Sequence, residues 1–499
     1  MARTTGITVD EPAHIISSIL YWEGNDNLKP RDMPPLIKLT AGWRAGDAGF
    51  RIVEETHEAW RQRHEWLLAQ DMIARTPRRL LQPALAQSRL PLLVFPLGTA
   101  LLLWWWSRTL FGPVVALVSA LLFLLEPTAL GHAPLFKNDH AATFTYLLFW
   151  YCAWRYWQRP AWHTAMAMAF ALALACTAKL SMLVLLPITA GILVVRRCRA
   201  GFLVGPVVWL LLAAACQGEL RWLYGVPFPA HIYDGAVSLF GNTQGKVISV
   251  YLLGKVRPQG HWAYFLVAAA VKAPEVLLLL LLSGVGILLA RAARGKVSVA
   301  DLLWIVPGPM YFTMASMTPL QFGFRLVMPS LPFAILISGV ALQVLVRSKY
   351  RLLAFAAPAA MAVAVAAHYP HYLSHFNVLA GGPRNALRYL SDSNVGWGQD
   401  LRFLKRYVQE NKVPRLYVSY FGFDSIWSYF REDEVAWIQP PYGPLPETQY
   451  KPGPGLYAIS TNLLTGQFFA AEYRDYYKAF LERKPIAYAG NSIYIYRFP

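Results

Sequence analysis

The chain has 499 residues, of which 56% are hydrophobic and 14% aromatic, and its formal net charge is +18. With a mean hydropathy of +0.34, it is too apolar for a soluble protein of this length, so the composition predicts an integral membrane protein. The basic residues gather in short loops between apolar spans, at 196–199, 291–296 and 347–351. This distribution is typical of cytoplasmic loops and does not indicate nucleic-acid binding.

Residues 1–89 are mixed and amphipathic, and no signal peptide or membrane span precedes them. Apolar runs then fill 90–368, apart from an expected outer loop at about 218–260. The expected spans lie at about 90–107, 113–130, 141–157, 162–177, 180–195, 201–217, 300–317, 326–346 and 352–368, and a helix over 262–272 leads over Pro274 into a further span that ends near residue 290. After residue 368, polar composition, short alternating runs at 415–421 and 493–498, and Pro/Gly turns predict a soluble domain over 369–499. The predicted fold is therefore a polytopic α-helical membrane protein with a C-terminal soluble α/β domain.

If the basic loops lie in the cytoplasm, alternation of the spans fixes the side of every other segment. Residues 1–89, the 218–260 loop and the C-terminal domain then all lie outside the membrane. A segment near charge balance cannot easily cross a membrane by itself, so we expect that a first span upstream of Asp10 is missing from the chain as written. The polar residues expected on this outer face include Asp10, Glu11, Lys38, Asp139 and Lys179.

Adjacent carboxylates at Asp10 and Glu11 precede an apolar helical pattern, and Asp139 opens a later span. A carboxylate partly withdrawn from water can act as a general base toward an acceptor hydroxyl. The alternative for the first pair is an acidic first turn of the helix 12–21, and for Asp139 a helix cap. A divalent cation is possible between such acids, but nothing in their spacing indicates one, so no metal site and no cofactor are predicted.

The four cysteines are Cys152, Cys176, Cys198 and Cys216. They lie in or beside apolar segments and have no paired spacing. We interpret them as small core residues, with neither a disulfide framework nor a zinc site.

Lys179 interrupts a long apolar stretch, and a charge in such a place is costly enough to suggest a function. At the outer headgroup level, it could neutralise a phosphate that becomes a leaving group, or it could simply extend to the interface. Lys38, Lys272 and Arg325 are expected at similar positions and share both interpretations. Arg325 is the one that can bind phosphate through two parallel hydrogen bonds.

Residues 389–401 form the densest polar motif of the soluble part. Its candidate acceptor-site residues are Asp392, Asn394, Trp397 and Asp400. Such a cluster normally makes caps and turns, here before the predicted helix 400–410. The alternative is a wall of an acceptor site, in which Trp397 offers its apolar face to a sugar ring.

Several short motifs occur in a fixed order along the chain. They are Val9-Asp10-Glu11-Pro12-Ala13-His14, Pro34-Pro35-Leu36-Ile37-Lys38, Asn138-Asp139, Thr177-Ala178-Lys179, Trp262-Ala263-Tyr264-Phe265, Lys272-Ala273-Pro274 and Phe324-Arg325-Leu326-Val327-Met328-Pro329. These motifs resemble those of bacterial phospholipid-carrier-dependent glycosyltransferases. The run 372–383, continued by Asp392-Ser393-Asn394 and Trp397-Gly398-Gln399-Asp400-Leu401, resembles a subgroup signature. The chain is thus similar to the GT-C superfamily, family 39, which includes the protein O-mannosyltransferases and the aminoarabinose transferases. It departs from the family pattern at Met33, where a histidine is usual, and at Gly396, where an acid is usual.

This resemblance implies a GT-C-like fold and transfer of a sugar, with inversion, from a polyprenyl-phosphate donor to a hydroxyl of a protein or glycan acceptor. It also implies an outward-facing site in the bacterial plasma membrane. By motif, Asp10 is the expected base, Glu11 its neighbour and Asp139 a second acid. The expected phosphate contacts are Lys38, Lys179, Lys272 and Arg325. The alternatives are a transporter or lipid-binding membrane protein, and an inactive relative.

Overall fold

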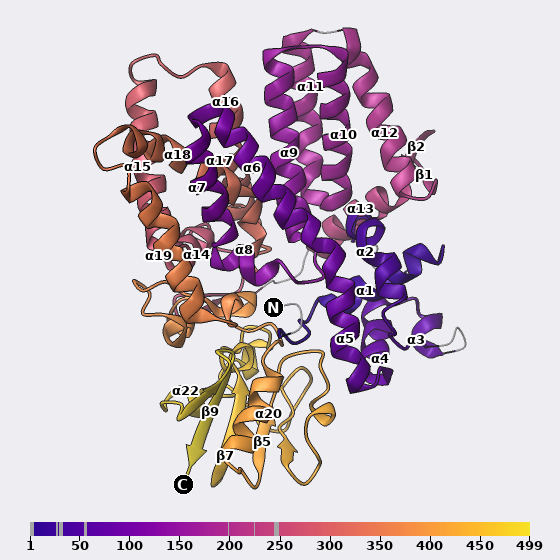
Figure 1. Ribbon diagram of the computed structural model, residues 1–499. Coiled ribbons are helices and arrows are strands. Elements are labelled where there is room, and N and C mark those ends of the chain that lie inside the picture. Colours follow the sequence, from indigo (N-terminus) through magenta and orange to yellow (C-terminus); the bar gives the residue numbers. More distant parts are fainter. Residues whose placement is uncertain are drawn as a thin grey trace.

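The computed structural model describes residues 4–25, 28, 33–53, 57–197, 199–223, 225–243 and 249–499. Figure 1 shows a bundle of long helices, a group of shorter N-terminal helices beside one end of it, and a sheet domain below that same end. Cys198 lies outside the described residues, whereas the other three cysteines are buried and free.

The N-terminal region is a small helical unit with its own apolar core. Its helices are α1 (Glu11–Trp22), α2 (Leu36–Gly46), α3 (Glu58–Arg61), α4 (Glu65–Arg75) and α5 (Arg78–Arg89). Pro12 stands in the first turn of α1, where its missing N–H costs no hydrogen bond. Because α5 continues through a 3₁₀ turn into the first long helix, the expected limit at residue 89 falls inside one helical run, Arg78–Phe111.

The bundle follows the apolar runs predicted from the sequence. Its helices are α6 (Val94–Phe111), α7 (Pro113–Leu124), α8 (Pro127–His132), α9 (Asp139–Gln158), α10 (Trp162–Ala178), α11 (Leu185–Arg196), α12 (Val204–Ala215), α14 (Tyr264–Lys272), α15 (Glu275–Ala292), α16 (Val299–Ile305), α17 (Pro307–Ser316), α18 (Leu331–Arg347) and α19 (Leu353–His368). Local chemistry sets several of these limits. Gly112, with φ +95°, turns the chain between α6 and α7, and Pro274 precedes α15.

Three helical runs of the described chain are long and apolar enough to cross a membrane: Arg78–Phe111, Glu275–Ala292 and Phe324–Arg347. Five further apolar helices are shorter. Large apolar side chains on the bundle surface lack protein neighbours. Leu101, Leu282 and Val363, for example, are 66%, 67% and 71% exposed. Exposed apolar side chains of this size are typical of helices that face lipid, so these helices form a membrane domain.

The segment expected as an outer loop at 218–260 contains regular structure. Strands β1 (Leu220–Leu223) and β2 (Val226–Pro229) form an antiparallel hairpin, followed by α13 (Ala230–Thr243) and a second hairpin of β3 (Val250–Leu252) and β4 (Lys255–Arg257). Leu252 also forms a bridge with Leu390, so this segment contacts the chain that leads into the C-terminal domain.

The predicted C-terminal domain is confirmed as a five-stranded mixed sheet in the order β6-β5-β7-β9-β8. The strands are β5 (Leu416–Ser419), β6 (Val435–Trp437), β7 (Gly455–Ser460), β8 (Ala487–Ala489) and β9 (Ile493–Phe498). Strand β5 is parallel to β6 and β7, whereas β9 is antiparallel to β7 and β8. The helices are α20 (Leu401–Glu410), α21 (Thr461–Leu464) and α22 (Lys478–Leu481), so the predicted helix 400–410 is also present.

Candidate active site

Charged side chains from four distant segments meet where the bundle joins the sheet domain. Asp10 directly precedes α1, Asp139 is the first residue of α9, and Lys179 follows the last residue of α10. Arg325 comes from η4 (Phe324–Ser330), the 3₁₀ turn before α18. In the middle of a helix, side chains pack against neighbouring helices. Side chains at the ends of helices are less constrained, so residues at these positions can meet and form a site.

The cluster is held together by a chain of ion pairs. Arg325 Nη1 lies 3.2 Å from Asp139 Oδ2, and its Nη2 lies 3.4 Å from Asp10 Oδ2. Lys137 Nζ lies 2.5 Å from Asp10 Oδ2, and Lys179 Nζ lies 3.1 Å from Asp139 Oδ1. We name these five residues the charged centre. It contains three cations and two carboxylates, so it keeps an excess positive charge that favours an anionic ligand.

Trp397 is stacked against this centre. The Arg325 guanidinium carbon lies 4.2 Å from the Trp397 ring centroid, and Lys137 Nζ lies 5.4 Å from it. Arg325 Nε also donates to Ser393 Oγ at 3.2 Å. Trp397 thus holds one face of the guanidinium, and Ser393, Asp139 and Asp10 contact its N–H groups. These contacts fix its orientation, which pre-organises it for bidentate contact with an anion.

Access to the centre differs among its members. The side chain of Asp139 is 1% exposed, whereas those of Asp10 and Lys179 are 22% and 19% exposed. Burial alone would raise the pKa of Asp10, but the Lys137 ammonium and Arg325 guanidinium outweigh it and hold the pKa below its usual range. Asp10 is therefore ionised and partly accessible to solvent. Its partner cations, Lys137 and Arg325, could also bind a phosphate.

Glu11 lies apart from the charged centre. Arg89 grips its carboxylate with two hydrogen bonds, of 2.8 Å from Nε and 2.7 Å from Nη2. The backbone N–H groups of Phe136 and Thr8 also donate to it, at 2.8 and 2.9 Å. Burial acts to raise the pKa of Glu11, but Arg89 and these hydrogen bonds hold it below its usual range. With no exposed surface and every lone pair occupied, this carboxylate fixes the segment that carries Lys137.

Lys272 and Asn394 join the bundle to the sheet domain. Lys272 Nζ donates to the backbone carbonyls of Leu373 and Asn394, at 2.9 and 2.7 Å. The Asn394 side chain accepts from Phe324 N and donates to Tyr264 Oη, both at 2.9 Å. Both residues are almost fully buried, and these contacts set the position of η4.

Asp400 and Asp392 also make internal contacts. Asp400 Oδ2 accepts from Ser492 Oγ at 2.8 Å and from Ser492 N at 3.2 Å, so it holds the turn between β8 and β9. Asp392 Oδ1 accepts from Ser393 N at 2.6 Å. Burial raises the pKa of Asp392 to about 7, against the opposing influence of Arg325.

Lys38 is buried on α2, and its backbone carbonyl accepts from the Trp22 indole at 2.7 Å. His14 interacts electrostatically with Lys38 and also with Asp10, Asp139 and Lys137. Burial keeps the pKa of His14 well below its usual value, so this ring is neutral.

Lys137, Ser393 and Arg89 were not predicted as site residues from the sequence. Lys137 precedes Asp139 by two positions, and this spacing was a signal that could have been used. Arg89 lies 78 positions from Glu11, so only the fold reveals their pairing. The structure also explains Gly396, because a Cβ there would lie 2.7 Å from Ser492 Cβ and leave no room for an acid. Within the described residues, no group of three or more His, Cys, Asp or Glu side chains could hold a metal ion.

A sequence profile of the family described as dolichyl-phosphate-mannose-protein mannosyltransferase matches residues 73–218. The chain is similar to that family over those residues. A search of curated proteins found no match.

Among solved structures, the chain is similar to ArnT from Cupriavidus metallidurans in the apo state, with 14% identity, coverage of 99% of this chain and 94% of that chain, and a TM-score of 0.47. The same protein bound to undecaprenyl phosphate matches with 13% identity, the same coverage and a TM-score of 0.43.

Proposed function

We propose that this chain is an inverting glycosyltransferase that moves a sugar from a polyprenyl-phosphate donor to an acceptor hydroxyl. The observation that carries the proposal is the charged centre. It presents an Arg325 fork and two lysines beside a partly exposed carboxylate, at the end of an apolar helix bundle. Such a place suits a lipid whose chain lies among helices and whose phosphate lies among cations. The family match over residues 73–218 supports the same reaction class.

The phosphate of the donor competes with Asp10 for Lys137 and Arg325, because both cations now pair with that carboxylate. Once the phosphate takes these cations, Asp10 loses the charges that lower its pKa and becomes a stronger base. Asp10 then takes the proton of the acceptor hydroxyl, whose oxygen forms a bond to the anomeric carbon. The bond from that carbon to the phosphate oxygen breaks, and the electron pair leaves with the polyprenyl phosphate.

The buried Asp139 plays a different part. Its two oxygens hold Lys179 and Arg325 at 3.1 and 3.2 Å, so it sets the distance between two cations that contact the leaving phosphate. Trp397 is buried against Arg325 and holds the guanidinium in place. Lys38, one helix away beyond His14, remains a candidate second contact for the phosphate.

The geometry favours positioning roles for the other residues predicted from the sequence. Glu11, Lys272 and Asn394 hold the segments that carry Lys137 and Arg325, rather than contacting a substrate themselves. Asp400 and Asp392 stabilise the loop on which Trp397 stands.

We place the site on the extracytoplasmic face of the bacterial plasma membrane. Figure 1 supports this placement, because the turns from α11 to α12 and from α15 to α16 lie at the end of the bundle opposite the sheet domain. Those turns carry the basic runs near 196–199 and 291–296. Basic loops mark the cytoplasmic side, so the charged centre and the sheet domain belong outside.

The proposal is tested with the full chain in lipid vesicles that contain undecaprenyl-phosphate-linked hexoses. We expect release of undecaprenyl phosphate and transfer of the sugar with inverted anomeric configuration. Asp10→Asn should lower turnover by roughly a hundredfold or more while the donor still binds. Asp433→Asn is the matched control, because Asp433 is 71% exposed in the sheet domain. Unchanged turnover in Asp10→Asn, or a retained configuration, would contradict the proposal.

A further inference from the structure

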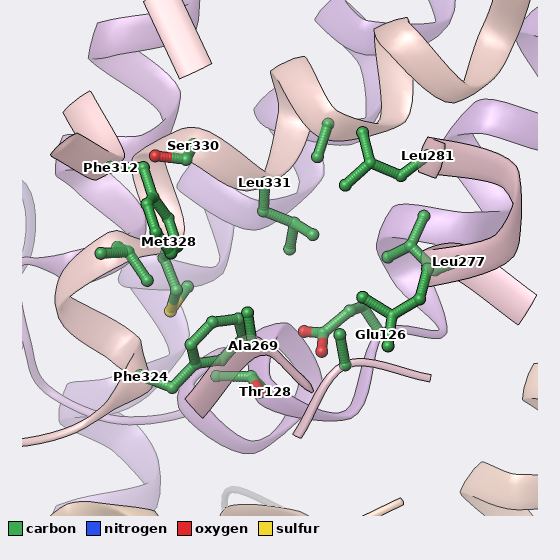
Figure 2. A pocket seen from close by; sticks show the side chains of 14 residues that line it. Glu126, Thr128, Ala269, Leu277, Leu281, Phe312, Phe324, Met328, Ser330 and Leu331 are labelled. Carbon is green, nitrogen blue, oxygen red and sulfur yellow. The ribbon is translucent and has the colours of Figure 1, made fainter. Parts of the chain in front are cut away.

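Apolar surface that the described chain leaves uncovered lies both inside and outside the bundle. Inside, Leu277, Leu281 and Leu331 surround a cavity of about 110 Å³ (Figure 2). An apolar cavity of this size can stay empty, so it needs no ligand. Outside, the hairpin of β1 and β2 carries large apolar side chains that face away from the rest of the chain. Such side chains mark a surface that contacts a partner or a membrane.

The hairpin has apolar side chains on both of its faces. Leu223 lies opposite Val226, and Phe228 follows two residues further along the same face. Leu223, Val226 and Phe228 are 36%, 54% and 42% exposed. Trp222, on the other face, is 71% exposed. An isolated hairpin has no core of its own, so its stability depends on what surrounds it.

The hairpin folds back along α12 instead of extending away from it. The Trp209 indole Nε1, on α12, donates to the backbone oxygen of Pro227 at 2.9 Å. Trp209 precedes Ala215, the last residue of α12, by six residues, or about 9 Å along the helix axis. Figure 1 shows both strands beside α12, on the outside of the bundle. Pro227 therefore lies deeper along the bundle than the end of α12.

This level of the bundle belongs in the membrane. The helical run Arg199–Ala215 is apolar and roughly 25 Å long, so it is shorter than the ~30 Å hydrocarbon core of a bilayer. Because Arg199 belongs to a basic run that marks one membrane boundary, Ala215 cannot lie beyond the opposite boundary. Leu210, on the same helix, is 60% exposed, so α12 has a lipid-facing surface. The hairpin thus lies at the depth of the leaflet nearer the sheet domain.

The backbone of the hairpin is adapted to this place. Antiparallel pairing alternates residue pairs that exchange hydrogen bonds with pairs whose N–H and C=O groups point outward. Proline has no N–H, so Pro227 and Pro229 occupy outward positions of β2. The edge of β2 beside α12 therefore offers no N–H group over Val226–Pro229, and the Pro227 oxygen accepts from Trp209. The other edge, on β1, keeps open N–H and C=O groups, which confine the hairpin to the interface, where headgroups and water can bind them.

We propose that the β1–β2 hairpin is an anchor in the membrane interface, with Trp222, Val226 and Phe228 in contact with lipid. Aromatic side chains are favoured at the boundary between headgroups and acyl chains, and a depth of about 9 Å agrees with the ~5–10 Å by which interfacial helices enter it. The exposed ion pair of Arg221 with Asp234, at 3.0 Å, lies where β1 begins and faces water. The anchor holds the start of α13 at the membrane surface. The proposal does not depend on the transferase reaction.

The test places a nitroxide spin label on the hairpin of the full chain in phosphatidylcholine vesicles. Val226→Cys is labelled in a Cys198→Ser chain, because the other three cysteines are buried. Molecular oxygen concentrates in the bilayer and a water-soluble nickel chelate does not, so the ratio of their collision rates with the label reports its depth. This ratio should approach that of Leu282→Cys, on the lipid-facing side of α15. It should be several times that of Trp437→Cys, the matched control, whose side chain is apolar and 40% exposed in the sheet domain.

Two results would overturn the proposal. A ratio equal to that of Trp437→Cys would place the hairpin in water. Low collision rates with both reagents would mean that a second protein chain covers it. Trp222→Cys samples the opposite face of the hairpin and should give the same ratio as Val226→Cys, so it decides the question if Val226→Cys does not fold.

Discussion

Asp10 and Glu11 are neighbours in sequence, yet the structure predicts opposite consequences when each loses its charge. Asp10→Asn removes the partner of Lys137 and one partner of Arg325, at a position where the carboxylate is 22% exposed. Glu11→Gln instead neutralises one half of the Glu11–Arg89 pair, in which neither side chain has exposed surface. The pair of variants therefore separates chemistry from stability within two adjacent residues.

The magnitudes follow from burial. When one partner of a fully buried ion pair is removed, the charge left behind is uncompensated, and about 3–5 kcal/mol of stability is lost. Arg89 in Glu11→Gln would keep the carbonyls of Thr5 and Gly6 as partners, which favours the lower half of that range. Asp10→Asn should cost less, about 1 kcal/mol, because the Asp10 side chain is 22% exposed and Arg325 keeps Asp139 as a partner. Its effect should appear in turnover, where loss of a general base costs roughly a hundredfold or more.

Stability is measured by reversible unfolding in mixed micelles, and turnover by release of polyprenyl phosphate from the fraction that remains folded. The double variant Glu11→Gln/Arg89→Gln should recover part of the lost stability, because it removes the unpaired charge. The assigned roles of Asp10 and Glu11 would be wrong if Glu11→Gln unfolded like the unmodified chain and turned over as slowly as Asp10→Asn. In that case Glu11 would be the chemical group and its bonds to Arg89 would not be structural.

Three further outcomes test the surroundings of the charged centre. Arg325→Lys keeps the charge but loses the fork between Asp139 and Asp10, so steady-state assays should show kcat/KM lowered by roughly tenfold to a hundredfold. Trp397→Ala removes the ring under Arg325 and with it a cation–π contact of about 1 kcal/mol, so kcat/KM should fall roughly fivefold. Trp397→Phe keeps an aromatic ring, so its kcat/KM should lie nearer the unmodified value. The pKa of Asp392 is raised to about 7 from 3.8. Between these two pH values, the folded chain keeps a proton that the unfolded chain has lost, so the stability of the fold falls as pH rises through that window. Asp392→Asn should remove this loss, seen as a flatter dependence of Tm on pH from about 4 to 7.

Much of the fold follows from the sequence because proline, glycine and apolar runs act locally. The helix limits at Gly112 and Pro274 and the final strand, Ile493–Phe498, depend on nearby residues alone. The structured hairpins within 218–260 were not expected, since their strands are only three or four residues long and alternate weakly.

Part of the candidate site could be predicted because charged side chains are rare and costly among apolar membrane spans. A lysine or arginine among apolar spans needs an anion, which selected Lys179 and Arg325, and both do meet Asp139. The partners of Glu11, Lys272 and Asp400 could not be inferred in this way. Each depends on backbone groups or side chains far along the chain, such as Arg89 for Glu11 and Ser492 for Asp400.

The charged centre depends on contacts that the loop before α20 makes with two other segments of the chain. Val9 N donates to Trp397 O at 2.9 Å, and Gly6 packs so closely on Gln399 that a Cβ would lie 2.5 Å from its carbonyl oxygen. On the other side, Asn394 holds the backbone of Phe324, next to Arg325. The loop before α20 therefore contacts both the segment that carries Asp10 and the turn that carries Arg325. Because this one loop sets the distance between the proposed base and the proposed phosphate contact, the sheet domain is part of the active-site architecture even though its Asp392 and Asp400 are buried.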